Sequence, residues 1–172
     1  NISWENSWLD MFANLISYNE PTSKEGLPNF ACGMLAITLI GVFLFAGGIK
    51  IREKISSVIL LGIIAVSCNM NKLDYIWHGF HETNQLPYRF AFIFSFILAV
   101  MAYRAYDVLT DKGIKLYHLP LLLIGPAAIG VVTYYSKKAA GEVFNLGDTA
   151  LKSSLLITGA YILIIVCMKF IP

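Results

Sequence analysis

The sequence is poor in charged residues and lacks the common motifs of soluble enzymes. Charged side chains make up 14% of its 172 residues, whereas soluble domains carry about a quarter. A formal net charge of +2 is too small to favour nucleic acid as a partner. The chain has no Gly-rich phosphate loop, no Gly-x-Ser-x-Gly and no His-Glu-x-x-His pattern, which excludes the enzyme classes that those motifs define. It also has no internal repeat and no low-complexity tract.

Cysteine is scarce as well. Cys32, Cys68 and Cys167 lie in or beside apolar blocks, without the spacing of a metal site. We interpret them as packing residues in a membrane. A disulfide between Cys32 and Cys68 is the alternative, because both sit toward the same side of a helical hairpin. The sequence predicts no cofactor and leaves a divalent metal open.

Apolar residues are abundant: they make up 57% of the chain, and the mean hydropathy is +0.65. They form five blocks that approach the roughly 20 residues of a membrane-crossing helix. The blocks are Phe30–Gly48, Ile55–Met70, Phe90–Tyr106, about Leu116–Tyr135 and about Ala150–Ile171. We therefore predict an all-α, polytopic membrane helix bundle over residues 29–172, with about five transmembrane helices in the cell membrane. The second block is short and the fourth contains Pro120 and Pro126, so one crossing is expected to be tilted, kinked or re-entrant.

The distribution of charge predicts an orientation. The connectors at 50–54 and 104–115, together with Lys169, carry seven basic and three acidic residues, while the opposite side carries six basic and eight acidic residues. Basic residues concentrate on the cytoplasmic side of membrane proteins. The polar loop at 71–89 and the segment before residue 29 are therefore predicted to face outward, although Lys137 and Lys138 argue the other way.

Residues 1–28 are predicted to form an extracytoplasmic, amphipathic segment followed by a loop. Apolar side chains recur there at helical spacing: Trp4, Trp8, Met11, Phe12, Leu15 and Ile16. This pattern favours an N-terminal interfacial helix with its tryptophans at the level of the lipid headgroups, rather than a crossing. The alternative is a lid over a site for a lipid substrate.

The strongest functional signal is the polar loop at 71–89, because polar and charged groups at a membrane edge are costly to desolvate. Pro87 favours a helix that starts near Arg89. A cation in the first turn of a helix is disfavoured by the helix dipole, so Arg89 beside free backbone N–H groups suits a bound phosphate or carboxylate. The alternatives are that Arg89 extends to ordinary headgroups or pairs with Asp74 or Glu82.

Asp74, His78 and Glu82 are four residues apart, and His81 reaches the same face if the segment is helical, an assumption that Gly79 weakens. Three readings stay open: a metal site or acid–base pair, hydrogen bonding to a sugar or headgroup, and a satisfied structural network. Trp77 and Phe80 flank His78, and their rings suit either stacking on a sugar or anchoring at the membrane interface. The predicted substrate-binding residues are Asp74, Trp77, His78, His81, Asn84 and Arg89, and no catalytic residue is identified.

Two motifs carry a resemblance to a known family. The run Asp74-x-x-Trp-His-Gly-Phe80, followed by Asn84-x-x-Pro-Tyr-Arg-Phe90-x-Phe92, resembles the bacterial YfhO family of membrane proteins. The run Leu27-Pro-Asn-Phe-Ala-Cys-Gly33 looks like the loop-to-helix entry of that family. The resemblance covers about residues 27–106 well. Thr83 stands where the family pattern has a proline.

The resemblance implies a fragment of a GT-C-type glycosyltransferase. Such an enzyme takes a sugar from a polyprenyl-phosphate carrier and modifies a cell-envelope polymer on the outer face. By this resemblance the catalytic acidic residue is expected before Asn1, and the implied partners are the bilayer, the lipid-linked sugar donor, the polymer acceptor and the rest of the polypeptide. The alternatives are a transporter or flippase of a lipid-linked sugar, and a non-catalytic membrane scaffold.

Overall fold

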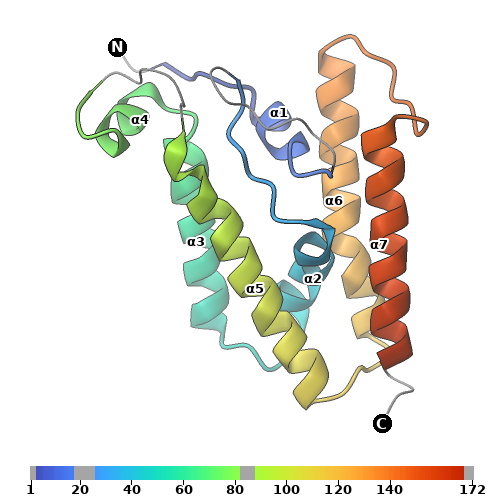
Figure 1. Cartoon of the computed structure of the whole chain (residues 1–172). Helices are drawn as coiled ribbons and strands as arrows, with labels where there is room; N and C mark the ends of the chain where they lie inside the picture. The colour runs from blue at the N-terminus through green and yellow to red at the C-terminus, as the bar shows by residue number, and fades with distance from the viewer. Residues whose placement is uncertain (1–2, 18–25, 82–87, 169–172) are drawn as a thin grey trace.

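The computed structural model describes residues 3–17, 26–81 and 88–168. Within these ranges the chain is helical, and an isolated bridge between Trp4 and Met70 is the one strand-like pairing. The elements are α1 (Trp8–Ala13), α2 (Met34–Phe45), α3 (Ile51–Ser67), α4 (Asn71–Trp77), the short 3-10 helix η1 (Arg89–Ala91), α5 (Phe92–Asp111), α6 (His118–Ala139) and α7 (Thr149–Met168). Figure 1 shows α3 beside α5 and α6 beside α7, with α1 and α4 at one end of the bundle. The all-helical membrane fold is confirmed.

Each predicted apolar block forms a helix, and among the described residues three helices are long and apolar enough to cross a membrane: Arg89–Asp111, His118–Ala139 and Thr149–Met168. The first block departs most from expectation. Its helix, α2, has 12 residues, or about 18 Å at 1.5 Å per residue, against a hydrocarbon core of about 30 Å. Gly33, with a φ of +82°, precedes it, and the backbone is extended again at Ala46.

The fourth block, by contrast, forms an uninterrupted helix in spite of its two prolines. Pro126 lies inside α6. Pro120 is the third residue of this helix, where the backbone N–H has no acceptor within the helix and its loss costs little. In α3, which has 17 residues, the first turn holds the charged residues Arg52, Glu53 and Lys54, so its apolar part is shorter than that of α5, α6 or α7.

The short helix α2 forms the centre of the bundle. It packs against α5, α6 and α7, and Figure 1 shows it between the two outer helix pairs. Two glycines set its crossing with α6. A Cβ added at Gly41 would overlap the carbonyl oxygen of Leu121, and one added at Gly125 would overlap the carbonyl oxygen of Ile37. Small residues of this kind allow helix backbones in a membrane to approach closely.

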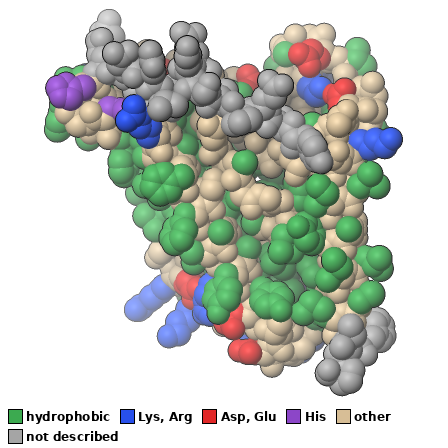
Figure 2. All heavy atoms as spheres, in the orientation of Figure 1, with side chains coloured by type: hydrophobic (Ala, Val, Ile, Leu, Met, Phe, Trp, Pro, Cys, Tyr) green, Lys and Arg blue, Asp and Glu red, His purple; other side chains and the backbone are tan. Residues whose placement is uncertain are grey.

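Charged residues gather at the two ends of the bundle, while hydrophobic side chains cover its middle (Figure 2). At the lower end in Figure 1 the α2–α3 connector and the α5–α6 connector lie together. There the Lys54 Nζ donates hydrogen bonds to the carbonyl oxygens of Leu44 (2.9 Å) and Ala46 (2.8 Å) at the end of α2. The two basic connectors thus share one end, as the charge pattern predicted.

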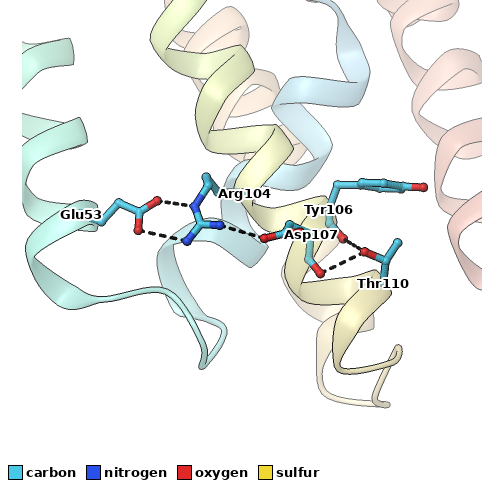
Figure 3. A network of polar contacts seen from close by, with 5 residues as sticks. All are labelled: Glu53, Arg104, Tyr106, Asp107 and Thr110. Atoms are coloured by element: carbon cyan, nitrogen blue, oxygen red, sulfur yellow. Dashed lines mark hydrogen bonds and ion pairs between the residues drawn. The ribbon is translucent and has the colours of Figure 1, made fainter.

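An ion-pair network joins α3 to α5 at this lower end (Figure 3). The Arg104 Nε donates to Glu53 Oε1 at 2.6 Å, and its Nη2 lies 3.3 Å from Glu53 Oε2. The Arg104 Nη1 donates to Asp107 Oδ2 at 2.8 Å. The structure thus pairs Arg104 with an acidic residue of its own helix and, through a bidentate contact, with α3.

The N-terminal segment, residues 3–17, runs across the opposite end of the bundle. It begins at the α3–α4 junction, where Glu5 N–H donates to the Asn69 carbonyl at 2.9 Å, and it reaches α7, where Ser17 N–H donates to Ser154 Oγ at 2.9 Å. The Phe12 ring packs against Phe30 and Phe94. With six residues, or about 9 Å, α1 is too short to cross a bilayer, and its place at the membrane interface stays a prediction.

Candidate functional site

The polar loop begins with the short helix α4, which a glycine brings to an end. Gly79 has a φ of +68°, a conformation that glycine adopts without strain. Its N–H donates to the Ile76 carbonyl, and the Phe80 N–H donates to the Tyr75 carbonyl. These two bonds form a Schellman motif, and the rings of Tyr75 and Phe80 meet edge to face with centroids 6.0 Å apart.

Asp74 and His78 meet on α4, as their spacing predicted. The His78 Nδ1 lies 2.8 Å from the Asp74 backbone oxygen and 3.4 Å from its carboxylate Oδ1. Because a carbonyl oxygen only accepts, Nδ1 carries the proton in this contact. Asp74 is buried at 5% exposure. The pair therefore lies largely inside the protein.

The face shared by Asp74 and His78 does not continue to His81. The helix ends at Trp77, with His78 as its C-cap, and His81 lies beyond the turn with an exposed side chain. His81 would join this face only if the helix continued through it, and the helix does not. Asn84 and Glu82 lie outside the described residues. Within the described residues no group of three or more His, Cys, Asp or Glu side chains has the arrangement of a metal site.

Aromatic stacking brings the end of α4 to the start of the next helix. The Trp77 ring stacks on Phe90 with centroids 4.9 Å apart and an interplanar angle of 17°, and His78 meets Phe90 edge to face at 6.1 Å. Phe90 is buried, whereas Trp77 keeps 46% of its surface exposed. One face of Trp77 is thus used for packing, and the remaining surface lies open beside the start of η1.

Arg89 is the first residue of the helical run Arg89–Asp111, which confirms the predicted helix start. Its side chain is exposed. Tyr88 precedes it with a φ of +58°, a left-handed conformation that is rare for a tyrosine. Arg89 adjoins Phe90, so the structure places Trp77, His78 and Arg89 at the same end of the bundle.

A hydrogen-bond network that sequence reasoning missed holds Tyr88 in this conformation. The Tyr88 hydroxyl donates to Glu5 Oε2 at 2.7 Å and accepts from Asn6 Nδ2 at 2.9 Å, while Asn6 N–H donates to Asn69 Oδ1 at 2.7 Å. Burial, followed by the hydrogen bond to Glu5, raises the pKa of the Tyr88 hydroxyl. The sequence hint of this network was the pair of polar residues after Trp4, Glu5 and Asn6. Their local sequence gave no indication of partners more than sixty residues away.

All three cysteines are free thiols, so the alternative disulfide between Cys32 and Cys68 is not formed. Cys68 is fully buried next to this network. Cys32 is partly buried and packs against the core. Both are packing residues.

The helices and the two polar ends define a helical membrane protein. Comparison with known proteins gives the family: the family described as bacterial membrane protein YfhO matches residues 2–171. The chain belongs to the YfhO family. No curated protein and no solved structure matches it.

Proposed function

We propose that the chain is part of a multi-pass, membrane-embedded glycosyltransferase of the cell membrane. The enzyme moves a sugar from a polyprenyl-phosphate carrier to a cell-envelope acceptor on the outer face. The bilayer, the lipid-linked donor, the polymer acceptor and the rest of the polypeptide are its partners. The substrate-side residues of this segment are Asp74, Trp77, His78, His81, Asn84 and Arg89.

The observation that carries the proposal is the stacking of Trp77 on Phe90, the chain neighbour of Arg89, at one end of the bundle. An exposed guanidinium at a helix start suits a phosphate, since it offers a bidentate fork beside backbone N–H groups. A half-exposed tryptophan offers a flat apolar face to a sugar ring. A lipid-linked sugar phosphate combines both groups, and it approaches a membrane protein at this level of the bilayer.

The decisive assay measures transfer of labelled sugar from a polyprenyl-phosphate donor by the full-length protein in vesicles. Arg89→Lys keeps the charge but loses the bidentate fork, so transfer should fall while expression stays near normal. Arg89→Ala should lower transfer further and raise the donor concentration for half-maximal rate. Arg52, an exposed arginine at the opposite end, supplies the matched control variants Arg52→Lys and Arg52→Ala, which should transfer sugar at the parental rate.

Two results would contradict the proposal. One is a well-folded Arg89→Ala protein that binds donor as tightly as the parent. The other is movement of the labelled lipid across the bilayer without any transfer, which would establish the flippase instead.

Orientation is tested separately with single cysteines in a Cys-free background and an impermeant thiol reagent on intact cells. Because the polar loop is proposed to face outward, Thr83→Cys should be labelled and Arg52→Cys protected. The reverse pattern would place the polar loop in the cytoplasm and remove the proposed site from the outer face.

A further inference from the structure

A second polar site lies under the N-terminal segment, away from Arg89. An open cleft of about 500 Å³ separates α1 from α6, within the range of about 300–1,000 Å³ typical of small-molecule sites. The lining residues that bear on its chemistry are Asp10, Ile16, Leu27, Ser136, Lys137 and Glu142. Its walls come from three separate parts of the chain: the N-terminal segment, the loop before α2, and the end of α6.

The polar groups of this cleft keep unused hydrogen-bonding capacity. The Asp10 Oδ1 accepts from Ser136 Oγ at 2.6 Å, and within the described residues no hydrogen bond reaches Oδ2. The Ser136 oxygen donates in this bond and keeps its lone pairs. The Lys137 Nζ donates to Asp148 and lies 3.6 Å from Glu142 Oε2, an ion pair without a hydrogen bond, which leaves two of its three N–H donors. The cleft therefore offers acceptors and a donor side by side, the combination that a hydroxyl group requires.

The charge of the lining decides against an anion. Asp10 and Glu142 contribute two carboxylates and Lys137 contributes one ammonium group, and that ammonium group is already engaged by carboxylates. A phosphate here would face a net negative surface. The apolar side chains of Ile16, from the same segment as Asp10, and Leu27, from the loop before α2, add surface that suits the C–H face of a sugar ring. An uncharged, hydroxyl-rich group fits this mixed lining.

We propose that the cleft between α1 and α6 binds an uncharged carbohydrate group, with Asp10 and Ser136 holding its hydroxyls. The assignment deepens the proposed function and rests on it for the source of the sugar. Arg89 and Trp77 hold the phosphate and the sugar attached to it, whereas Asp10 meets the hydroxyls of a carbohydrate group farther from the phosphate. The carbohydrate comes either from the donor or from the acceptor, and both present the same chemistry to the cleft.

Saturation-transfer NMR on the full-length protein in nanodiscs tests the assignment. Methyl glycosides of glucose, galactose and mannose serve as uncharged probes, and glucose 1-phosphate serves as the anionic probe. At least one methyl glycoside should bind saturably and more tightly than the phosphate. Displacement of that glycoside by a polyprenyl-phosphate sugar would identify the donor as the source, and undisturbed glycoside binding would identify the acceptor.

Isosteric variants locate the binding. Asp10→Asn and Ser136→Ala should each raise the dissociation constant by about tenfold or more, the loss expected when a hydrogen bond to a charged group is removed. Asp111→Asn removes an exposed carboxylate at the opposite end and should leave glycoside binding unchanged. Tryptophan fluorescence and melting temperature confirm that each variant is folded.

The assignment is overturned if the parent protein gives no glycoside signal, or if folded Asp10→Asn and Ser136→Ala bind as the parent does. Failure of the proposed function has a different signature. In that case the glycoside binds and depends on Asp10, but no variant and no parent protein transfers sugar in the vesicle assay.

Discussion

Replacing Gly41 by alanine is expected to force α2 away from α6. The added Cβ would overlap the carbonyl oxygen of Leu121 and lie 2.9 Å from the Ile124 Cβ. The first of these is a backbone atom, so no change of side-chain rotamer relieves the overlap. The helices must separate, and because α2 also packs against α5 and α7, the displacement spreads through the bundle.

The magnitude follows from two opposing terms. Overpacking of a well-packed core costs about 1–3 kcal/mol. Because the clash here is with a backbone atom and α2 is central, we take the upper value of about 3 kcal/mol. Alanine recovers about 1 kcal/mol through its higher helix propensity. The free energy of unfolding should therefore fall by about 2 kcal/mol, which is roughly a thirtyfold change in the ratio of folded to unfolded protein.

Gly130 on α6 supplies a matched control, because a Cβ there meets no atom within 4 Å. Gly130→Ala should be neutral or stabilising, by up to about 1 kcal/mol. Gly125→Ala should behave like Gly41→Ala, since its Cβ would overlap the Ile37 carbonyl. One separation of the helices relieves both overlaps, so the double variant should cost clearly less than the sum of the single variants.

The assay is denaturant-induced unfolding of the full-length protein in mixed micelles, followed by circular dichroism. The reasoning fails if Gly41→Ala is as stable as Gly130→Ala. It also fails if the costs of Gly41→Ala and Gly125→Ala add in full, because two independent sites would then be responsible rather than one crossing.

Three further changes test other parts of the structure. Arg104→Gln and Glu53→Gln should show a small coupling in a double-mutant cycle of unfolding, since the pair is bidentate but about one-third exposed; additive costs would contradict the contact. Gly79→Ala should destabilise the end of α4 by about 1 kcal/mol, because alanine is strained at a φ of +68°, and hydrogen exchange at α4 would detect it. Cys68, fully buried, should resist maleimide until the protein unfolds, and rapid labelling in the folded state would show that it is accessible.

Hydropathy predicted which parts of the chain are helical, but it did not predict how much of each apolar block the helix covers. The block Phe90–Tyr106 lies within one long helix, as expected. The block Phe30–Gly48 gives only Met34–Phe45, because backbone conformation rather than polarity ends the helix on both sides. Gly33 and Gly48 permit the positive φ values found there. Hydropathy does not reveal such backbone conformations.

The candidate site was predictable where its contacts are local. The four-residue spacing of Asp74 and His78 indicated their contact, and Pro87 indicated the helix start at Arg89. The stacking of Trp77 on Phe90 and the hydrogen bonds of Tyr88 were not predictable, because they join segments far apart in the sequence. A single sequence shows which polar residues are present, but it does not show which of them contact one another in the fold.

The N-terminal segment links the two proposed binding sites, and this accounts for the polar residues that accompany its apolar ones. Glu5 and Asn6 hold the Tyr88 hydroxyl beside Arg89, and Asp10 accepts from Ser136 at the cleft. Asp10 follows Glu5 by five positions and lies within α1, so this one segment carries both sets of contacts and sets their relative placement. A ligand that lifts α1 from α6 therefore pulls on the contacts that hold Tyr88, which precedes the first turn of the helix carrying Arg89. Binding of a carbohydrate in the cleft and binding of a phosphate at Arg89 should consequently depend on one another.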